Sequence, residues 1–134
     1  MACQSYPMLF AIKKMIKTKS ILLKREPEDG VRVCVMRFVK VFYVYDVWKE
    51  VLAPSKNLLY YYRNKKITWD IFNSRYKQEM MTSKFSVEEI KKLKELSSTG
   101  QIITLLCWER EDKYCHRRIL KGLIDNYRGI NNAS

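Results

Sequence analysis

Alternating apolar and polar positions predict two strands in the first third of the chain. Residues 15–21 alternate as a half-buried strand does, and residues 31–38 repeat the pattern with valines at every second position from 31 to 35. Residues 26–30, Glu-Pro-Glu-Asp-Gly, have turn composition. Residues 39–45 are rich in β-branched and aromatic types, so this stretch can extend the second strand, form another strand, or connect irregularly.

Capping residues followed by helical spacing predict helices in the middle of the chain. Asp46 has the side chain of an N-cap for a helix over residues 47–52, which Pro54 should end. Ser55 can cap a second helix over residues 56–64. Thr68 can cap a third helix, whose apolar residues form one stripe that we expect to pack in the core. The stripe consists of Trp69, Phe72, Tyr76 and Met80.

The last third of the chain predicts a helix, a buried strand and a final helix. Residues 86–89 fit a capping box, and Gly100 closes the helix that follows. Its expected inward residues are Val87, Ile90, Leu93 and Leu96. Residues 101–107 are nearly continuously apolar, as in a central strand covered on both faces. A final helix begins at about Cys115. Its expected inward residues are Ile119, Leu120, Leu123 and Ile124.

This order of elements predicts an α/β fold: a small single-domain sheet, at least partly parallel, with helices packed on it. The 134 residues, 47% of them hydrophobic, suit one compact domain with a modest core. We assign residues 15–128 to this domain and residues 129–134 to a C-terminal tail. Residues 1–14 are assigned to an N-terminal extension, because their apolar patch precedes the lysines, the reverse of a signal peptide, and Met15 would serve as a start.

The charge favours anionic partners without naming one. With 26 basic and 14 acidic residues, the formal net charge is +12. Residues 60–66, Tyr-Tyr-Tyr-Arg-Asn-Lys-Lys, interleave aromatic and basic side chains, which suits stacking on nucleic-acid bases and neutralising phosphates. The same residues fit a helix packing face, and exposed lysines are common in thermophile proteins. Nucleic acid is therefore one of two partner classes, and a small anionic ligand is the other.

The length of the apolar runs and the pattern of cysteines predict a cytoplasmic protein. No apolar run reaches the ~18 residues that a transmembrane helix needs, so we expect no membrane partner. The four cysteines show neither a secretory signal nor the spacing of a small disulfide-bonded domain. We therefore expect a cytoplasmic protein whose thiols are mostly free.

Candidate chemistry begins where the apolar run stops, at Cys107. The carboxyl ends of parallel strands meet at one edge of a sheet, so we expect Arg37, at the carboxyl end of the second strand, to lie near Cys107, Glu109 and the start of the last helix. Arg37, His116 and Arg117 would bind an anion, because guanidinium groups offer several planar donors and a helix start adds free N–H groups. Glu109 would serve as a base.

The candidate nucleophile is Cys115, whose thiolate the helix N-terminus would stabilise. The alternative is a buried free cysteine that packs as a small apolar residue. Cys115 and His116 suit a nucleophile–base pair poorly, because neighbours on a helix point about 100° apart. Cys107, Cys115 and His116, with Glu109 or Cys34, could formally ligate zinc, but their spacing matches no zinc motif. We predict no metal site, and the sequence indicates no particular cofactor.

Six short motifs, in order from about Met15 to Leu123, resemble the domain of unknown function 488 family, most closely its archaeal branch. They are residues 28–33 (EDGVRV), 46–48 (DVW), 52–55 (LAPS), 69–72 (WDIF), 75–80 (RYKQEM), and Leu105 to Cys107 with Cys115 to Arg117. The resemblance implies a small intracellular α/β domain and supports treating residues 1–14 as an extension. It implies no established reaction.

Family members carry an arginine, an aromatic residue, a proline and a second arginine after the second strand. Arg37 matches the first arginine, but residues 38–42 lack the proline and the second arginine, so part of the family's pocket is altered here. The sequence thus predicts a small α/β protein that binds a small anionic or phosphate-bearing ligand at a strand-end pocket. Whether it is an enzyme is left open, and nucleic-acid binding through the basic surface is the alternative.

Overall fold

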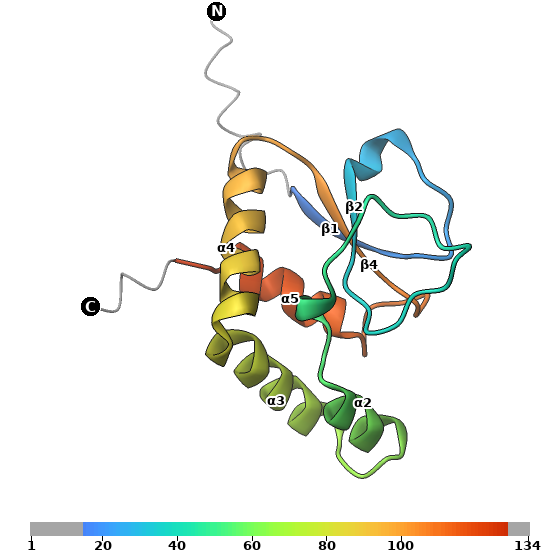
Figure 1. Cartoon of the computed structure of the whole chain (residues 1–134), viewed down its shortest axis with the longest axis vertical. Coiled ribbons are helices and arrows are strands. Elements are labelled where there is room, and N and C mark those ends of the chain that lie inside the picture. Colours follow the sequence, from blue (N-terminus) through green and yellow to red (C-terminus); the bar gives the residue numbers. More distant parts are fainter. Residues whose placement is uncertain (1–14, 129–134) are drawn as a thin grey trace, which may run out of the picture.

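The computed structural model describes residues 15–128, so the predicted extension and tail lie outside the described part of the chain. Its strands form one sheet with the order β1-β4-β2-β3, in which every neighbouring pair is parallel (Figure 1). The strands are β1 (Ile16–Ser20), β2 (Val31–Cys34), β3 (Val47–Trp48) and β4 (Ile103–Cys107). The predicted α/β fold with a parallel sheet is confirmed.

Helices cover one face of this sheet. They are α2 (Lys56–Arg63), α3 (Trp69–Thr82), α4 (Lys84–Ser98) and α5 (His116–Asp125). Two short 3₁₀ helices, η2 (Pro27–Asp29) and η3 (Glu50–Leu52), lie in the connections that follow β1 and β3. α5 packs on β1 and β4, and α3 and α4 pack against α5 (Figure 1). Within residues 15–128, none of the helices has the length and apolar character needed to cross a membrane.

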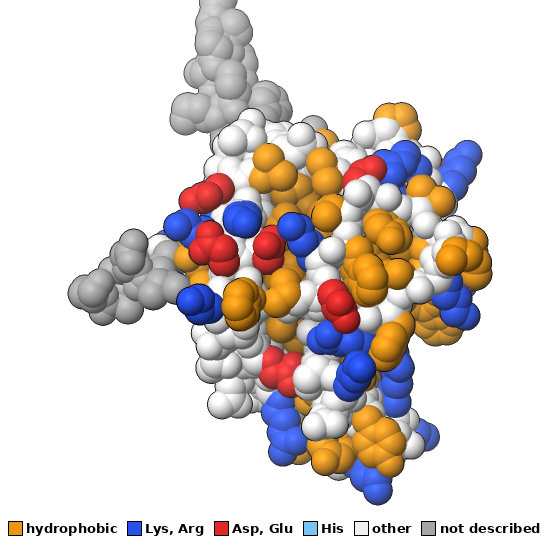
Figure 2. All heavy atoms as spheres, in the orientation of Figure 1, with side chains coloured by type: hydrophobic (Ala, Val, Ile, Leu, Met, Phe, Trp, Pro, Cys, Tyr) orange, Lys and Arg blue, Asp and Glu red, His pale blue; other side chains and the backbone are white. Residues whose placement is uncertain are grey.

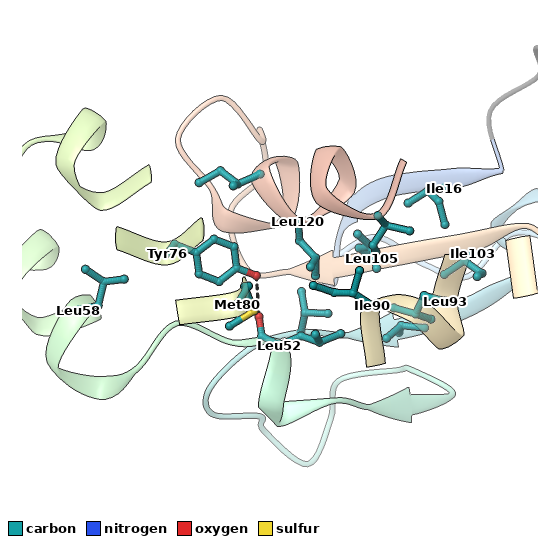
Figure 3. Close-up of a cluster of buried hydrophobic side chains, with 14 of the residues drawn as sticks. Ile16, Leu52, Leu58, Tyr76, Met80, Ile90, Leu93, Ile103, Leu105 and Leu120 are labelled. Atoms are coloured by element: carbon teal, nitrogen blue, oxygen red, sulfur yellow. Dashed lines mark hydrogen bonds between the residues drawn. The ribbon is translucent and has the colours of Figure 1, made fainter. Parts of the chain in front are cut away.

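The main core lies between the helices and the sheet. Ile103 and Leu105 of β4 are fully buried there, with Ile90 of α4 and Leu120 of α5 (Figure 3). β4 occupies the centre of the sheet, and all five of its residues are buried, as its continuous apolar run predicts. The β4 strand therefore ends deep in the molecule, with the carboxyl ends of β1 and β2 on either side of it.

The second face of the sheet is covered by the connection between β2 and β3, residues 35–46. Cys34 and Leu106 point to this face, opposite their neighbours in the main core, and the connection packs on them. Its route is irregular, and β2 ends at Cys34 rather than at residue 38. Arg32, fully buried, fixes the route: it donates to the Val44 carbonyl at 2.9 Å and to Asp29 at 2.8 Å.

Asp46 does not cap a helix, so that prediction is wrong. Residues 47–48 form the edge strand β3, and only the short η3 precedes Pro54. The Asp46 carboxylate instead accepts from Arg25 at 2.8 Å and from the backbone N–H of Arg32 at 2.7 Å. Contacts with segments distant in sequence thus override the local capping preference.

The predicted capping box at Ser86 is also wrong. α4 begins at Lys84, so Ser86 lies inside its first turn, where the hydroxyl donates to the Met80 carbonyl at 2.6 Å. The Ser55 and Thr68 caps are confirmed, since each side chain accepts a hydrogen bond from a backbone N–H three residues later. Three predicted inward residues of α4 are buried, but Leu96 is 40% exposed.

Candidate functional site

The connection from β4 to α5 carries the candidate site. β4 ends at Cys107, α5 begins at His116, and Cys115 occupies the N-cap position with an extended backbone. Arg117, in the first turn of α5, is 1% exposed and donates to the Glu109 carbonyl at 2.8 Å. A second, longer bond of 3.5 Å joins it to the Arg110 carbonyl. This buried guanidinium holds the connection against the helix start.

Two thiols and the histidine form a buried cluster at this junction. Cys107, Cys115 and His116 place their donor atoms within 4.8 Å of one another. His116 Nε2 lies 2.7 Å from the Val35 carbonyl and Nδ1 lies 3.6 Å from Cys107 Sγ. Because a carbonyl only accepts, the Val35 contact favours the tautomer with its proton on Nε2. The edge-to-face contact with Tyr76, at 5.4 Å between centroids, further fixes the imidazole.

Cys115 is the acidic thiol of the cluster. A hydrogen bond from Cys107 lowers the pKa of Cys115 to about 4, with further contributions from His116 and the Arg117 backbone amide, although burial opposes the shift. The pKa of Cys107 is raised by its hydrogen bond to Cys115 and by burial. The pair therefore holds one negative charge on Cys115, next to a protonated Cys107 thiol.

Glu109 shares a proton with this thiolate. Its Oε1 lies 3.3 Å from Cys115 Sγ. Burial raises the pKa of Glu109, and the charge on Cys115 raises it further. Two anions so close together are unfavourable, so the carboxyl group keeps its proton to a higher pH than an exposed glutamate does.

A surface opening of about 470 Å³, the Glu109 pocket, lies beside the cluster. Its lining consists of Leu22, Trp108, Glu109, Arg110, Glu111, Lys113 and Tyr114. Trp108 and Tyr114 are about half exposed, and they form apolar walls next to charged groups. Glu109 belongs both to this pocket and to the contacts of the buried thiol cluster. Glu109 therefore links the surface pocket to the buried thiol cluster.

The structure brings together four of the five predicted site residues, namely Glu109, Cys115, His116 and Arg117. Arg37 is placed elsewhere. Its guanidinium donates to the backbone carbonyls of Ala53 and Pro54, at 3.2 and 2.8 Å, and to Glu50 at 3.3 Å. Among its hydrogen bonds within residues 15–128, none reaches the other four.

The sequence prediction missed the aromatic walls of the pocket. A usable signal was present, because Trp108 directly follows the buried strand and Tyr114 directly precedes Cys115, so neither belongs to the apolar stripe of a predicted element. It also missed the contact between Cys107 and His116, which depends on how the helix start folds back onto the strand end.

The donor set of two thiols and an imidazole suits Zn²⁺ by type. The buried Arg117 guanidinium opposes a metal there. Its NH1 group lies 3.5 Å from Cys115 Sγ, where it already supplies positive charge to the thiolate. A divalent cation bound to the same sulfur would be repelled at close range in a poorly solvated space.

The chain was also compared with known proteins. A family model described as the active DUF488-N3 subclade matches residues 16–128, which include the whole sheet and all the helices described above. No curated protein and no solved structure matches the chain. Since the family match covers most of the sequence, this chain belongs to the DUF488 family, in its active N3 subclade.

Proposed function

We propose that this protein is an enzyme that binds a small anionic or phosphate-bearing ligand in the Glu109 pocket and uses Glu109 to transfer a proton. One observation carries the proposal: Glu109 lines the pocket and its carboxyl group lies 3.3 Å from a buried, acidic thiol. Perturbed, interacting titratable groups beside a pocket are typical of catalytic sites. The description of the matching subclade as active agrees with an enzymatic role.

Glu109 acts first as a general acid. Below its raised pKa the carboxyl group is protonated, and Cys115 stabilises that form by disfavouring a second negative charge. Once Glu109 has given its proton to the ligand, it is a carboxylate and can act as the base in the return step. Cys115 is 2% exposed, which fits a thiolate that tunes Glu109 from behind better than one that attacks the ligand directly.

Charged residues at the rim of the Glu109 pocket recognise the ligand. Arg110 and Lys113 are exposed there and supply positive charge to an anionic group. His116 and Arg117 are buried, and they act by positioning Cys115 and the Glu109 backbone. An archaeal, thermophilic source and a cytoplasmic location stay predictions from the sequence alone.

Binding of a phosphate-bearing probe as a function of pH tests this proposal. Ribose 5-phosphate, pyrophosphate and inorganic phosphate are titrated into the full chain by calorimetry at pH 5 to 8. Protonated Glu109 does not repel an anion, so we expect binding to weaken as pH rises through the pKa of Glu109, beyond any change caused by the probe's own ionisation. Glu109→Gln is neutral at every pH and should remove that part of the pH dependence while keeping the affinity measured at low pH.

Glu111→Gln is the matched control, because Glu111 also lines the pocket and its carboxylate is exposed. Arg110→Gln and Lys113→Gln should each weaken binding severalfold. Equal pH dependence in the unmodified protein and in Glu109→Gln would overturn the role of Glu109. Absence of binding by all three probes would overturn the ligand class.

Nucleic-acid binding is a second candidate, favoured by the surface around α2. Tyr60 and Tyr61 are 56% and 41% exposed, and exposed Arg63, Lys65 and Lys66 follow them. Figure 2 shows basic side chains gathered in this part of the molecule, with apolar ones among them. Exposed rings next to exposed cations suit single-stranded nucleic acid.

Fluorescence anisotropy with labelled single-stranded DNA and RNA at several salt concentrations tests this second function. Three cations on the backbone give a log–log slope of roughly −2. The double variant Arg63→Gln, Lys66→Gln should bring this slope closer to zero by about 1.4. The pair Lys91→Gln, Lys92→Gln on α4 is the charge-matched control. Equal slopes for the two double variants would exclude the α2 surface.

A further inference from the structure

A groove between α3 and α5 adjoins the Glu109 pocket and is larger, at about 760 Å³ compared with about 470 Å³. We call it the α3–α5 groove. Trp69, Asn73 and Lys77 line it from α3, and Arg118 lines it from α5. Its volume lies in the range of pockets that bury a small organic molecule. It touches the Glu109 pocket at one rim, where Lys113 and Tyr114 line both.

Positive charge dominates the groove. Four of its lining residues are basic and none is acidic. Lys77 and Arg118 are exposed and lie on the two facing helices. Within residues 15–128, neither of these two is in a salt bridge with an acidic residue. The α3–α5 groove therefore presents cations from both walls to an anion placed between them.

An aromatic wall and an unpartnered acceptor complete the groove. The Trp69 ring stacks on Phe72 at 5.2 Å and meets the edge of Tyr114 at 5.5 Å, so two rings are held next to each other in the wall of the groove. Asn73 Oδ1 is buried and has no hydrogen-bond partner among the described residues. A buried acceptor without a partner is costly, and an N–H donor on a bound molecule would satisfy it.

We propose that the α3–α5 groove is a binding site for a nucleoside monophosphate, a planar ring with N–H donors attached to a phosphate. The ring packs against Trp69 and Tyr114, and an N–H group of the base donates to Asn73 Oδ1. The phosphate lies between Lys77 and Arg118, where a guanidinium can donate two hydrogen bonds to it. This site is independent of proton transfer by Glu109.

Calorimetric titration of the full chain tests the proposal with adenosine 5′-monophosphate, adenosine and inorganic phosphate as probes. We expect the nucleotide to bind at least tenfold more tightly than either fragment. Arg118→Gln should weaken nucleotide binding about tenfold, and Lys77→Gln severalfold. Asn73→Leu should weaken nucleotide and adenosine binding about tenfold and leave phosphate binding unchanged. Lys91→Gln, an exposed lysine of α4 away from the groove, is the matched control.

The outcomes separate this inference from the proposed function. Arg118→Gln should weaken nucleotide binding by the same factor in the Glu109→Gln background as in the unmodified chain, so loss of the acid–base role leaves the groove intact. Equal affinities of Arg118→Gln and Lys91→Gln, with circular dichroism showing both folded, would overturn the site. Binding of a single-stranded oligonucleotide without binding of the mononucleotide would also overturn it, because the groove would then belong to a nucleic-acid surface.

Discussion

The acidity of Cys115 gives the sharpest prediction for the candidate site. With a pKa of about 4, this thiol is about 99% ionised at pH 6. An ordinary thiol, with a pKa of about 8.5, is less than about 1% ionised at the same pH. The pKa values of the other two described thiols, Cys34 and Cys107, are raised. We therefore expect one thiolate per folded chain at pH 6.

The ultraviolet absorbance of the thiolate measures this directly. Folded protein at pH 6 should show one thiolate more than Cys115→Ser, and the difference should disappear as pH falls through about 4. The sign follows from a lowered pKa, because the charged form is present above that value and is lost below it. Unfolding at pH 6 should also abolish the signal, since the thiol then returns to its ordinary pKa.

Two substitutions of Cys107 test the cause of the shift. Cys107→Ala removes the S–H group next to the Cys115 thiolate, whereas Cys107→Ser keeps an O–H group at the same position. A hydrogen bond to a charged group contributes about 1.5–3 kcal/mol, so Cys107→Ala should raise the pKa of Cys115 by about one to two pH units. Cys107→Ser should leave it near its native value. Identical titrations of the two variants would refute Cys107 as the cause of the shift, and an unchanged absorbance in Cys115→Ser would refute the thiolate itself.

Two further predictions concern the scaffold, measured as the free energy of unfolding in urea. Gly30 has a φ of 63°, and a Cβ there would lie 2.1 Å from the Ile102 carbonyl oxygen, so Gly30→Ala should cost at least about 3 kcal/mol. Gly100→Ala, also at positive φ but with nothing within 4 Å, should cost only about 1 kcal/mol, and equal costs would contradict the steric argument. Tyr76→Phe removes the buried O–H that donates to the Leu52 carbonyl at 2.7 Å, and it should cost about 1–2 kcal/mol; a stability within error of the native value would contradict that role.

The elements that the sequence predicts correctly are those whose signal is local. Ser55 and Thr68 cap helices because each satisfies a backbone N–H only three residues away. Asp46 and Ser86 carry the same kind of signal, but their partners are Arg25, Arg32 and the Met80 carbonyl. A polar side chain that has a strong partner elsewhere in the structure bonds to that partner and does not cap the local helix. Neither the spacing of residues nor their helix propensity reveals the distant partner.

The same distinction separates the predicted site residues. Glu109, Cys115 and Arg117 lie within nine residues across one strand-to-helix junction, so any short connection brings them together. The position of Arg37 depends on the course of the chain after β2. That connection turns over the second face of the sheet, and the guanidinium binds the Ala53 and Pro54 carbonyls instead of reaching the junction.

Two neighbouring residues at the start of α5, Cys115 and His116, organise the junction through different contacts. Cys115 and His116 contact different partners, although their donor atoms lie within 4.8 Å of each other. His116 turns inward to the Val35 carbonyl and Cys107, whereas Cys115 faces Glu109. Contacts therefore run from the sheet through His116, Cys107 and Cys115 to Glu109 at the pocket. A change at His116, which does not line the pocket, should reach Glu109 by altering the orientation of Cys107 and so the charge on Cys115.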